Sequence, residues 1–165
     1  MRTSALIRVI EGYSYNSTKQ PFSRVILLWN IQPGFQGLFR ALTLAAAQSV
    51  SIARDIGANI SIHLQFMALA ARQGVQLLVF PELSLTGYEL DAAAQLAIKL
   101  DDPRLAPLRK MAQNNAMTAV IGMPVRLTGG PEILIGALVF HPDGTQSLYS
   151  KQQAASSICI QVKNL

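Results

Sequence analysis

The chain has 165 residues, half of them apolar, a formal net charge of +5 and one cysteine. This length suits a single domain with a sizeable core, and one cysteine excludes an internal disulfide framework. No stretch approaches the roughly 18 uninterrupted apolar residues of a membrane helix. Because Arg8 and Glu11 interrupt the first apolar run, a signal peptide is not expected either. We therefore expect a cytoplasmic protein without membrane contact.

The positive charge is concentrated in the first 40 residues, which carry +4, whereas residues 41–165 carry only +1. No run of clustered Lys or Arg with interleaved aromatic residues is present, so nucleic-acid binding is not expected. Residues 1–40 also show no clear period and contain several Gly and Pro residues. We expect them to form an irregular extension outside the domain, with at most one short strand at 24–31.

The domain is expected to open with a strand at 41–48, ALTLAAAQ. An amphipathic helix is predicted next, because apolar residues recur at helical spacing from Ile56 to Ala71 and Gly74 stands where a C′ glycine would end the helix. His63 lies in the middle of this helix. Its simplest interpretation is a packing or surface residue.

Residues 75–88, VQLLVFPELSLTGY, form the most informative stretch. The apolar run that ends at Phe80 is typical of a strand buried on both faces. Pro81 cannot donate to a ladder and should close the strand. Glu82 is then placed at the carboxyl end of the strand, where open α/β sheets form their ligand crevices.

Helices and strands continue to alternate through the remainder. Asp91 should cap a short helix that runs to about residue 100, and Asp102, followed by proline, should begin a second helix that ends near 115. A buried strand is predicted at 118–123, ended by Pro124. A further strand is predicted at 133–140, followed by a hairpin loop at 141–144 and a partner strand at 145–150 that leads to Lys151. The pattern indicates a layered α/β fold.

The motif FPELSLTGY resembles the glutamate motif of the nitrilase superfamily, the carbon–nitrogen hydrolases. The Asp-Gly turn, Tyr149, Lys151 and Gln152 resemble its lysine motif. The likeness runs from about residue 41 to about residue 152, which leaves 1–40 as an extension and 153–165 as an unrelated tail. It implies an α-β-β-α sandwich that is incomplete on its C-terminal side.

The resemblance also implies the chemistry, which is hydrolysis of a nonpeptide C–N bond in a small amide, carbamoyl compound or nitrile by a Glu-Lys-Cys triad. Glu82 would be the general base, and Lys151 would stabilise the oxyanion. Tyr88 would line the pocket, with packing an equal alternative. No cofactor and no metal are implied.

The nucleophile departs from this pattern. In the family it follows the lysine after a further loop and strand, whereas Cys159 comes only eight positions after Lys151. Cys159 is therefore a poor candidate, and we expect the chain to be catalytically incomplete. A truncated or frameshifted non-catalytic copy and a pseudoenzyme that binds small amides remain alternatives. A sheet without its later strands would expose an apolar edge, so homo-oligomerisation is also expected.

Overall fold

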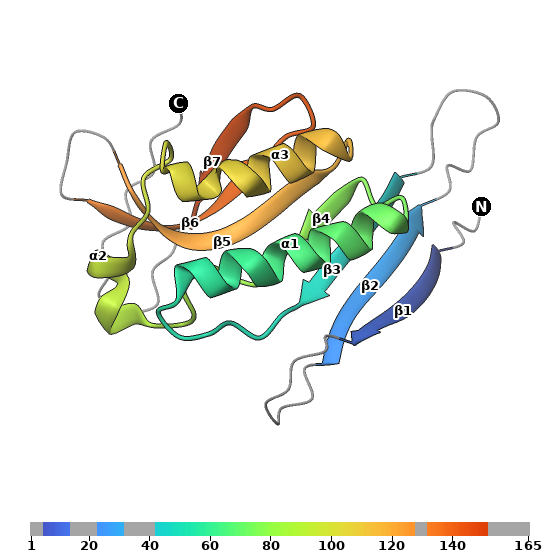
Figure 1. The fold of residues 1–165 in the computed structure, drawn as a ribbon, viewed down its shortest axis with the longest axis horizontal. Helices are drawn as coiled ribbons and strands as arrows, with labels where there is room; N and C mark the ends of the chain where they lie inside the picture. Colours follow the sequence, from blue (N-terminus) through green and yellow to red (C-terminus); the bar gives the residue numbers. More distant parts are fainter. Residues whose placement is uncertain (1–4, 14–22, 32–41, 128–131, 152–165) are drawn as a thin grey trace.

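The computed structural model describes residues 5–13, 23–31, 42–127 and 132–151, and these form one mixed sheet with helices packed on one side (Figure 1). The strands are β1 (Ala5–Tyr13), β2 (Ser23–Ile31), β3 (Leu42–Gln48), β4 (Leu77–Val79), β5 (Thr118–Arg126), β6 (Ile133–Phe140) and β7 (Gln146–Ser150). The helices are α1 (Ile56–Arg72), α2 (Ala93–Leu96) and α3 (Ala106–Asn114), with 3-10 turns η1 (Leu90–Ala92) and η2 (Pro103–Leu105).

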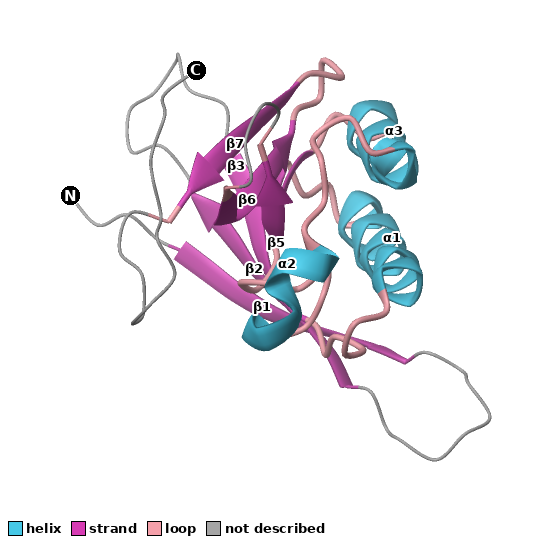
Figure 2. Ribbon diagram, turned by 90° about the vertical axis from the view of Figure 1, so that its left-hand side faces the viewer, coloured by secondary structure: helices cyan, strands magenta, loops and turns pink. Residues whose placement is uncertain are grey.

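The seven strands lie in the sheet in the same order as in the chain. β3, β4 and β5 are parallel, because helical crossovers connect them, and every other neighbouring pair is antiparallel. Figure 2 shows α1 and α3 side by side on one face of this sheet. The layered α/β fold predicted from the alternation of elements is therefore confirmed for β3 to β7.

The expectation of an irregular segment at residues 1–40 was wrong for one stretch, residues 5–13. β2 agrees with the strand predicted at 24–31, but β1 was not predicted at all. The two strands pair antiparallel with each other, and β2 pairs along the whole of β3. The β1 segment, ALIRVIEGY, contains strand-forming residues without a clear period, and pairing with β2 supplies the context that makes it a strand.

The two long helices begin and end with the signals that the sequence contains. Asp55 caps α1 by accepting from the backbone N–H of Ala58, and Gly74 follows the helix with φ of +68°. Asp102 caps the turn that leads into α3 by accepting from the N–H of Arg104 at 2.9 Å. The predictions at Gly74 and Asp102 are confirmed, whereas the cap at Asp55 was not predicted.

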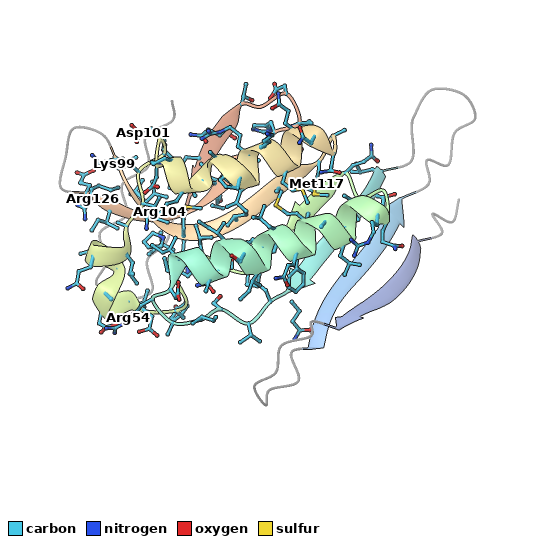
Figure 3. All side chains as sticks on the ribbon, viewed as in Figure 1. Arg54, Lys99, Asp101, Arg104, Met117 and Arg126 are labelled. Atoms are coloured by element: carbon cyan, nitrogen blue, oxygen red, sulfur yellow. The ribbon has the colours of Figure 1, made fainter. Side chains whose placement is uncertain are left out.

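Asp91 does not cap a helix as expected. It lies within η1, whose N-cap is Glu89, and no side chain accepts from this turn. The carboxylates of Glu89 and Asp91 instead both bind the guanidinium of Arg54, each at 2.8 Å. Arg54 lies beside the η1–α2 segment in Figure 3. Asp91 therefore forms a long-range ion pair with Arg54 instead of the helix cap that the local sequence predicted.

Pro124 does not end β5, which continues to Arg126. The carbonyl of Pro124 accepts from the N–H of Ile98, and the N–H of Arg126 donates to the carbonyl of Ile98. In a strand, the nitrogen and the carbonyl of one residue face the same edge. The ring of Pro124 therefore faces this loop, not β6, and the β5–β6 ladder loses no hydrogen bond.

The core fills the space between the sheet and the helices α1 and α3. Alternate residues of each central strand face it, as the period of two requires. The fully buried members include Ala45, Leu78, Ile121 and Phe140 from the sheet and Phe66, Met67 and Leu108 from the helices. On the opposite face, apolar side chains stay accessible within the described residues. Val79 is 38% exposed and Tyr149 is 62% exposed.

In the described part of the chain, no helix is long and apolar enough to cross a membrane.

The Asp102 cap gives a first test. The side-chain hydrogen bonds from the Arg104 guanidinium, more than the cap bond itself, lower the pKa of Asp102 below the ordinary value of 3.8. Replacing it with Ala should reduce the free energy of unfolding by about 1 kcal/mol at neutral pH. This difference should shrink as the pH falls through the lowered pKa, because the protonated carboxyl loses its charge-assisted bonds to Arg104. Urea unfolding at several pH values measures both effects. Asp101→Ala, an exposed neighbour, should change little and serves as the control.

Candidate active site

Glu82 lies in a tight turn directly after β4, at the carboxyl end of the parallel strands. Within the turn, the N–H of Ser84 donates to the carbonyl of Pro81 at 3.2 Å, and the N–H of Gly87 donates to that of Leu83 at 2.9 Å. The location is the one predicted from the sequence. It is also where ligand sites form in open α/β sheets.

The residue after Glu82 has an unusual backbone. Leu83 has φ of +54°, a left-handed conformation that non-glycine residues seldom adopt, and its side chain is only 2% exposed. Such a conformation costs about 1–3 kcal/mol and persists only where the surroundings impose it. Burial of the leucyl side chain and the hydrogen bonds of the turn offset that cost. The turn is thus held in one conformation, which fixes where the Glu82 side chain begins.

Gly122 of β5 lies directly beneath this turn. A Cβ atom at Gly122 would come within 2.6 Å of the nitrogen of Leu83 and of the carbonyl oxygen of Pro81, and within 2.9 Å of the Cα of Glu82. Real Cβ contacts are never this short. The carbonyl of Gly122 also accepts from the N–H of Leu85 at 3.1 Å. The absence of a side chain at residue 122 therefore allows the turn to lie against the strand.

Lys151 reaches the same place from the other end of the domain. It follows β7, and its N–H donates to the carbonyl of Ile135 at 2.9 Å, which extends the ladder by one residue. Its Nζ donates to Oε1 of Glu82 at 2.8 Å across 69 residues of sequence. The two side chains are 40% and 44% exposed. The hydrogen bond and the charge of Glu82 raise the pKa of Lys151 above its usual value of 10.5, so the ammonium is fully charged at neutral pH.

A cavity of about 300 Å³ opens beside this ion pair. Glu82 and Lys151 provide its charged side, and the accessible face of the sheet provides apolar walls from Val79, Val120, Ile135, Ala137 and Tyr149. Apolar walls with a few convergent polar groups are typical of small-molecule sites. Its size suits a small substrate.

The structure brings Glu82 and Lys151 together, as the sequence predicted. The other two predicted site residues are Tyr88 and Cys159. Tyr88 is 62% exposed and is absent from the cavity lining, although its phenol lies close enough to raise the pKa of Lys151 slightly. Cys159 lies outside the described residues. Tyr149 and Gly122 do line the cavity and were not predicted as site residues. The alternation of β7, which places Tyr149 on the accessible face, was the one available signal. Among the described residues, no three metal-binding side chains converge.

The model of the carbon–nitrogen hydrolase family matches residues 43–156, and the chain belongs to this family. Solved structures with the same fold include a CN-hydrolase superfamily protein from Xanthomonas campestris, XC1258, at 23% identity and a TM-score of 0.57. This match covers 64% of the present chain and 38% of that one.

An amidase from Nesterenkonia sp. is 26% identical with a TM-score of 0.56, covering 70% of the present chain and 44% of the amidase. A glutamine-dependent NAD(+) synthetase from Cytophaga hutchinsonii gives 20% identity and a TM-score of 0.56, covering 70% and 20%. The present chain therefore spans less than half the length of each of these proteins. Together these matches confirm a partial nitrilase-superfamily domain.

The ion pair can be tested without any activity. Glu82→Gln should lower the pKa of Lys151 toward 10.5, because the variant loses the carboxylate charge that favours the ammonium. The lysine ¹³Cε resonances of labelled protein report this titration, with Lys151→Arg used to assign the signal. Glu89→Gln removes a carboxylate that pairs with Arg54 and should leave the Lys151 titration unchanged. An identical Lys151 pKa in the Glu82→Gln variant would contradict the contact.

Gly122→Ala should displace the turn of Glu82, because the added methyl would overlap backbone atoms that cannot rotate away. We expect a loss of about 1–3 kcal/mol in the free energy of unfolding, the usual cost of overpacking. A lowered pKa of Lys151 in the folded variant should accompany it. Gly57→Ala is the matched control. Its Cβ would meet Asp55 at an ordinary 3.7 Å, and alanine is the better helix former in α1. Equal stability of the two variants would show that the turn tolerates a side chain beneath it.

Proposed function

We propose that this chain carries the general base and the oxyanion-stabilising cation of a hydrolase that cleaves nonpeptide C–N bonds in small amides, carbamoyl compounds or nitriles. The single observation that supports this most strongly is the 2.8 Å contact between Lys151 and Glu82 at the edge of an apolar cavity. The pair combines a proton acceptor with a fixed positive charge, and both are close to space for a substrate.

In the proposed reaction on an amide or carbamoyl compound, Glu82 takes the proton of a thiol as the sulfur attacks the carbonyl carbon. The carboxylic acid so formed gives the proton to the leaving nitrogen. The acyl-thioester is then released by a water molecule that Glu82 deprotonates. Lys151 remains charged throughout, because its pKa is raised, and its ammonium offsets the negative charge that develops on the substrate oxygen.

The cavity favours a short, apolar substituent on the reacting carbon. Its walls are aliphatic and aromatic, and about 300 Å³ accommodates only a small molecule. The Nesterenkonia amidase supports this choice, because a mutant of that enzyme has been solved in complex with butyramide. In another mutant of the same amidase, the acetamide moiety of fluoroacetamide is covalently added to the active-site cysteine.

The thiol is the part of the triad that the described residues do not include. Cys159 is the one cysteine of the sequence, and it lies eight positions after Lys151. We propose that Cys159 does not serve as an efficient nucleophile and that this chain by itself binds small amides without turning them over. A non-catalytic copy and an amide-binding pseudoenzyme share this expectation.

Butyramide should therefore bind to the full chain without release of ammonia. For a ligand this small, a dissociation constant in the millimolar range, about −4 kcal/mol, is expected. Methyl NMR should show shifts at Ile135 and Val120 of the cavity, while Leu108 of the opposite face serves as the internal control.

Ammonia release that disappears in Cys159→Ala would contradict the incomplete triad. Absence of shifts at the cavity would contradict the substrate class.

A further inference from the structure

Helix α1 turns two buried polar side chains toward the segment that carries Glu82. Asn59 and His63 are four residues apart, so they lie on one face of the helix, and they are 0% and 1% exposed. Buried polar groups are costly unless they are hydrogen-bonded. The proposed mechanism uses neither side chain. The hydrogen-bond partners of Asn59 and His63 therefore indicate the role of these two buried side chains.

His63 connects the helix to Ser84 in the turn. Its Nδ1 lies 2.6 Å from the carbonyl oxygen of Asn59, and its Nε2 lies 2.9 Å from Oγ of Ser84. A carbonyl can only accept, so Nδ1 carries the proton. Burial lowers the pKa of His63 to about 4, which keeps the ring neutral at pH 7. Nε2 is then an acceptor, and the hydroxyl of Ser84 donates to it.

The same imidazole also contacts the turn on its other side. Its ring centroid lies 4.2 Å from that of Phe80, the last residue before Pro81. Phe80 is held in turn by an edge contact with Phe66 at 5.9 Å. His63 thus touches the chain two residues before Glu82 and two residues after it.

Asn59 secures the next residue of the turn. Its amide nitrogen donates to the carbonyl of Leu85 at 3.0 Å and to that of Ile52 at 2.8 Å. Its amide oxygen accepts from the N–H of Ile52 at 2.7 Å. The side chain therefore uses its polar atoms to join the loop before α1 to the turn of Glu82. Asn59 and His63 act from adjacent turns of one rigid helix.

The relative strengths of these contacts indicate which of them holds the turn. The ion pair of Glu82 and Lys151 is half exposed, and such pairs contribute only about 0–1 kcal/mol. Removing one partner of a buried hydrogen bond costs about 1–3 kcal/mol, because the other partner is left unsatisfied. The buried bonds from α1 therefore contribute more to holding the turn than the exposed pair does.

We propose that His63 is a positioning residue, which fixes the turn through Ser84 and Phe80 and so directs the Glu82 carboxylate toward Lys151 and the cavity. This inference rests on the proposed role of Glu82 as the base. Its test measures only the contact between Glu82 and Lys151, and therefore does not require turnover.

The test compares the Lys151 titration in folded variants of the full chain. His63→Phe keeps a ring against Phe80 but loses both hydrogen bonds, and Ser84→Ala removes the donor. Each should lower the pKa of Lys151 by roughly half of the drop caused by Glu82→Gln, because the carboxylate then faces the ammonium only part of the time. Because both substitutions break the same bond between His63 and Ser84, the double variant should lower the Lys151 pKa no further than His63→Phe alone. His63→Gln, which can still donate and accept, should restore part of the shift.

Met67→Leu is the matched control. It lies one turn further along the same face of α1, is fully buried and keeps the core volume without a polar contact to the turn. It should leave the Lys151 pKa unchanged even if the melting temperature falls. Should His63→Phe fail to fold, Ser84→Ala decides the question. An unaltered Lys151 titration in folded Ser84→Ala and His63→Phe proteins, whatever their melting temperatures, would overturn the proposal and assign His63 to packing alone.

Discussion

The close approach between Gly122 and the turn of residues 81–87 is the constraint on which the site depends. Backbone atoms of Pro81, Glu82 and Leu83 occupy the space that a side chain on β5 would need. The turn therefore adopts a compact form with left-handed backbone at Leu83 and Gly87, and few alternatives fit the same space. The direction of the Glu82 side chain follows from that form. The ion pair with Lys151 is a consequence of this direction and is not its main cause.

The two faces of the sheet have different roles because of this arrangement. One face is closed by α1 and α3 and contains the buried core. The other keeps apolar side chains accessible between β4 and β7, where they become the walls of the cavity. Helix α1 packs on one face but also contacts the turn that contributes to the cavity on the other. Its apolar residues fill the core, and its buried Asn59 and His63 bind the turn that carries Glu82.

Local signals gave correct predictions wherever one short segment contained all of its own determinants. The cap at Asp102 and the glycine after α1 are such cases. The predictions failed where a distant partner decided the outcome. Asp91 pairs with Arg54 instead of capping a helix, Pro124 faces the loop at Ile98, and β1 exists through its pairing with β2.

The sequence by itself determined the order of the elements from β3 to β7, the position of Glu82 after a buried strand and the arrival of Lys151 at the end of a hairpin strand. Motif and period are local properties, so they can be read from consecutive residues. Only the tertiary structure decided that the two charges meet at 2.8 Å across 69 residues and that Tyr149, not Tyr88, lines the cavity. It also decided that His63 contacts Phe80 before Glu82 and Ser84 after it. These facts depend on the register and packing of separate strands and helices, which no single segment encodes.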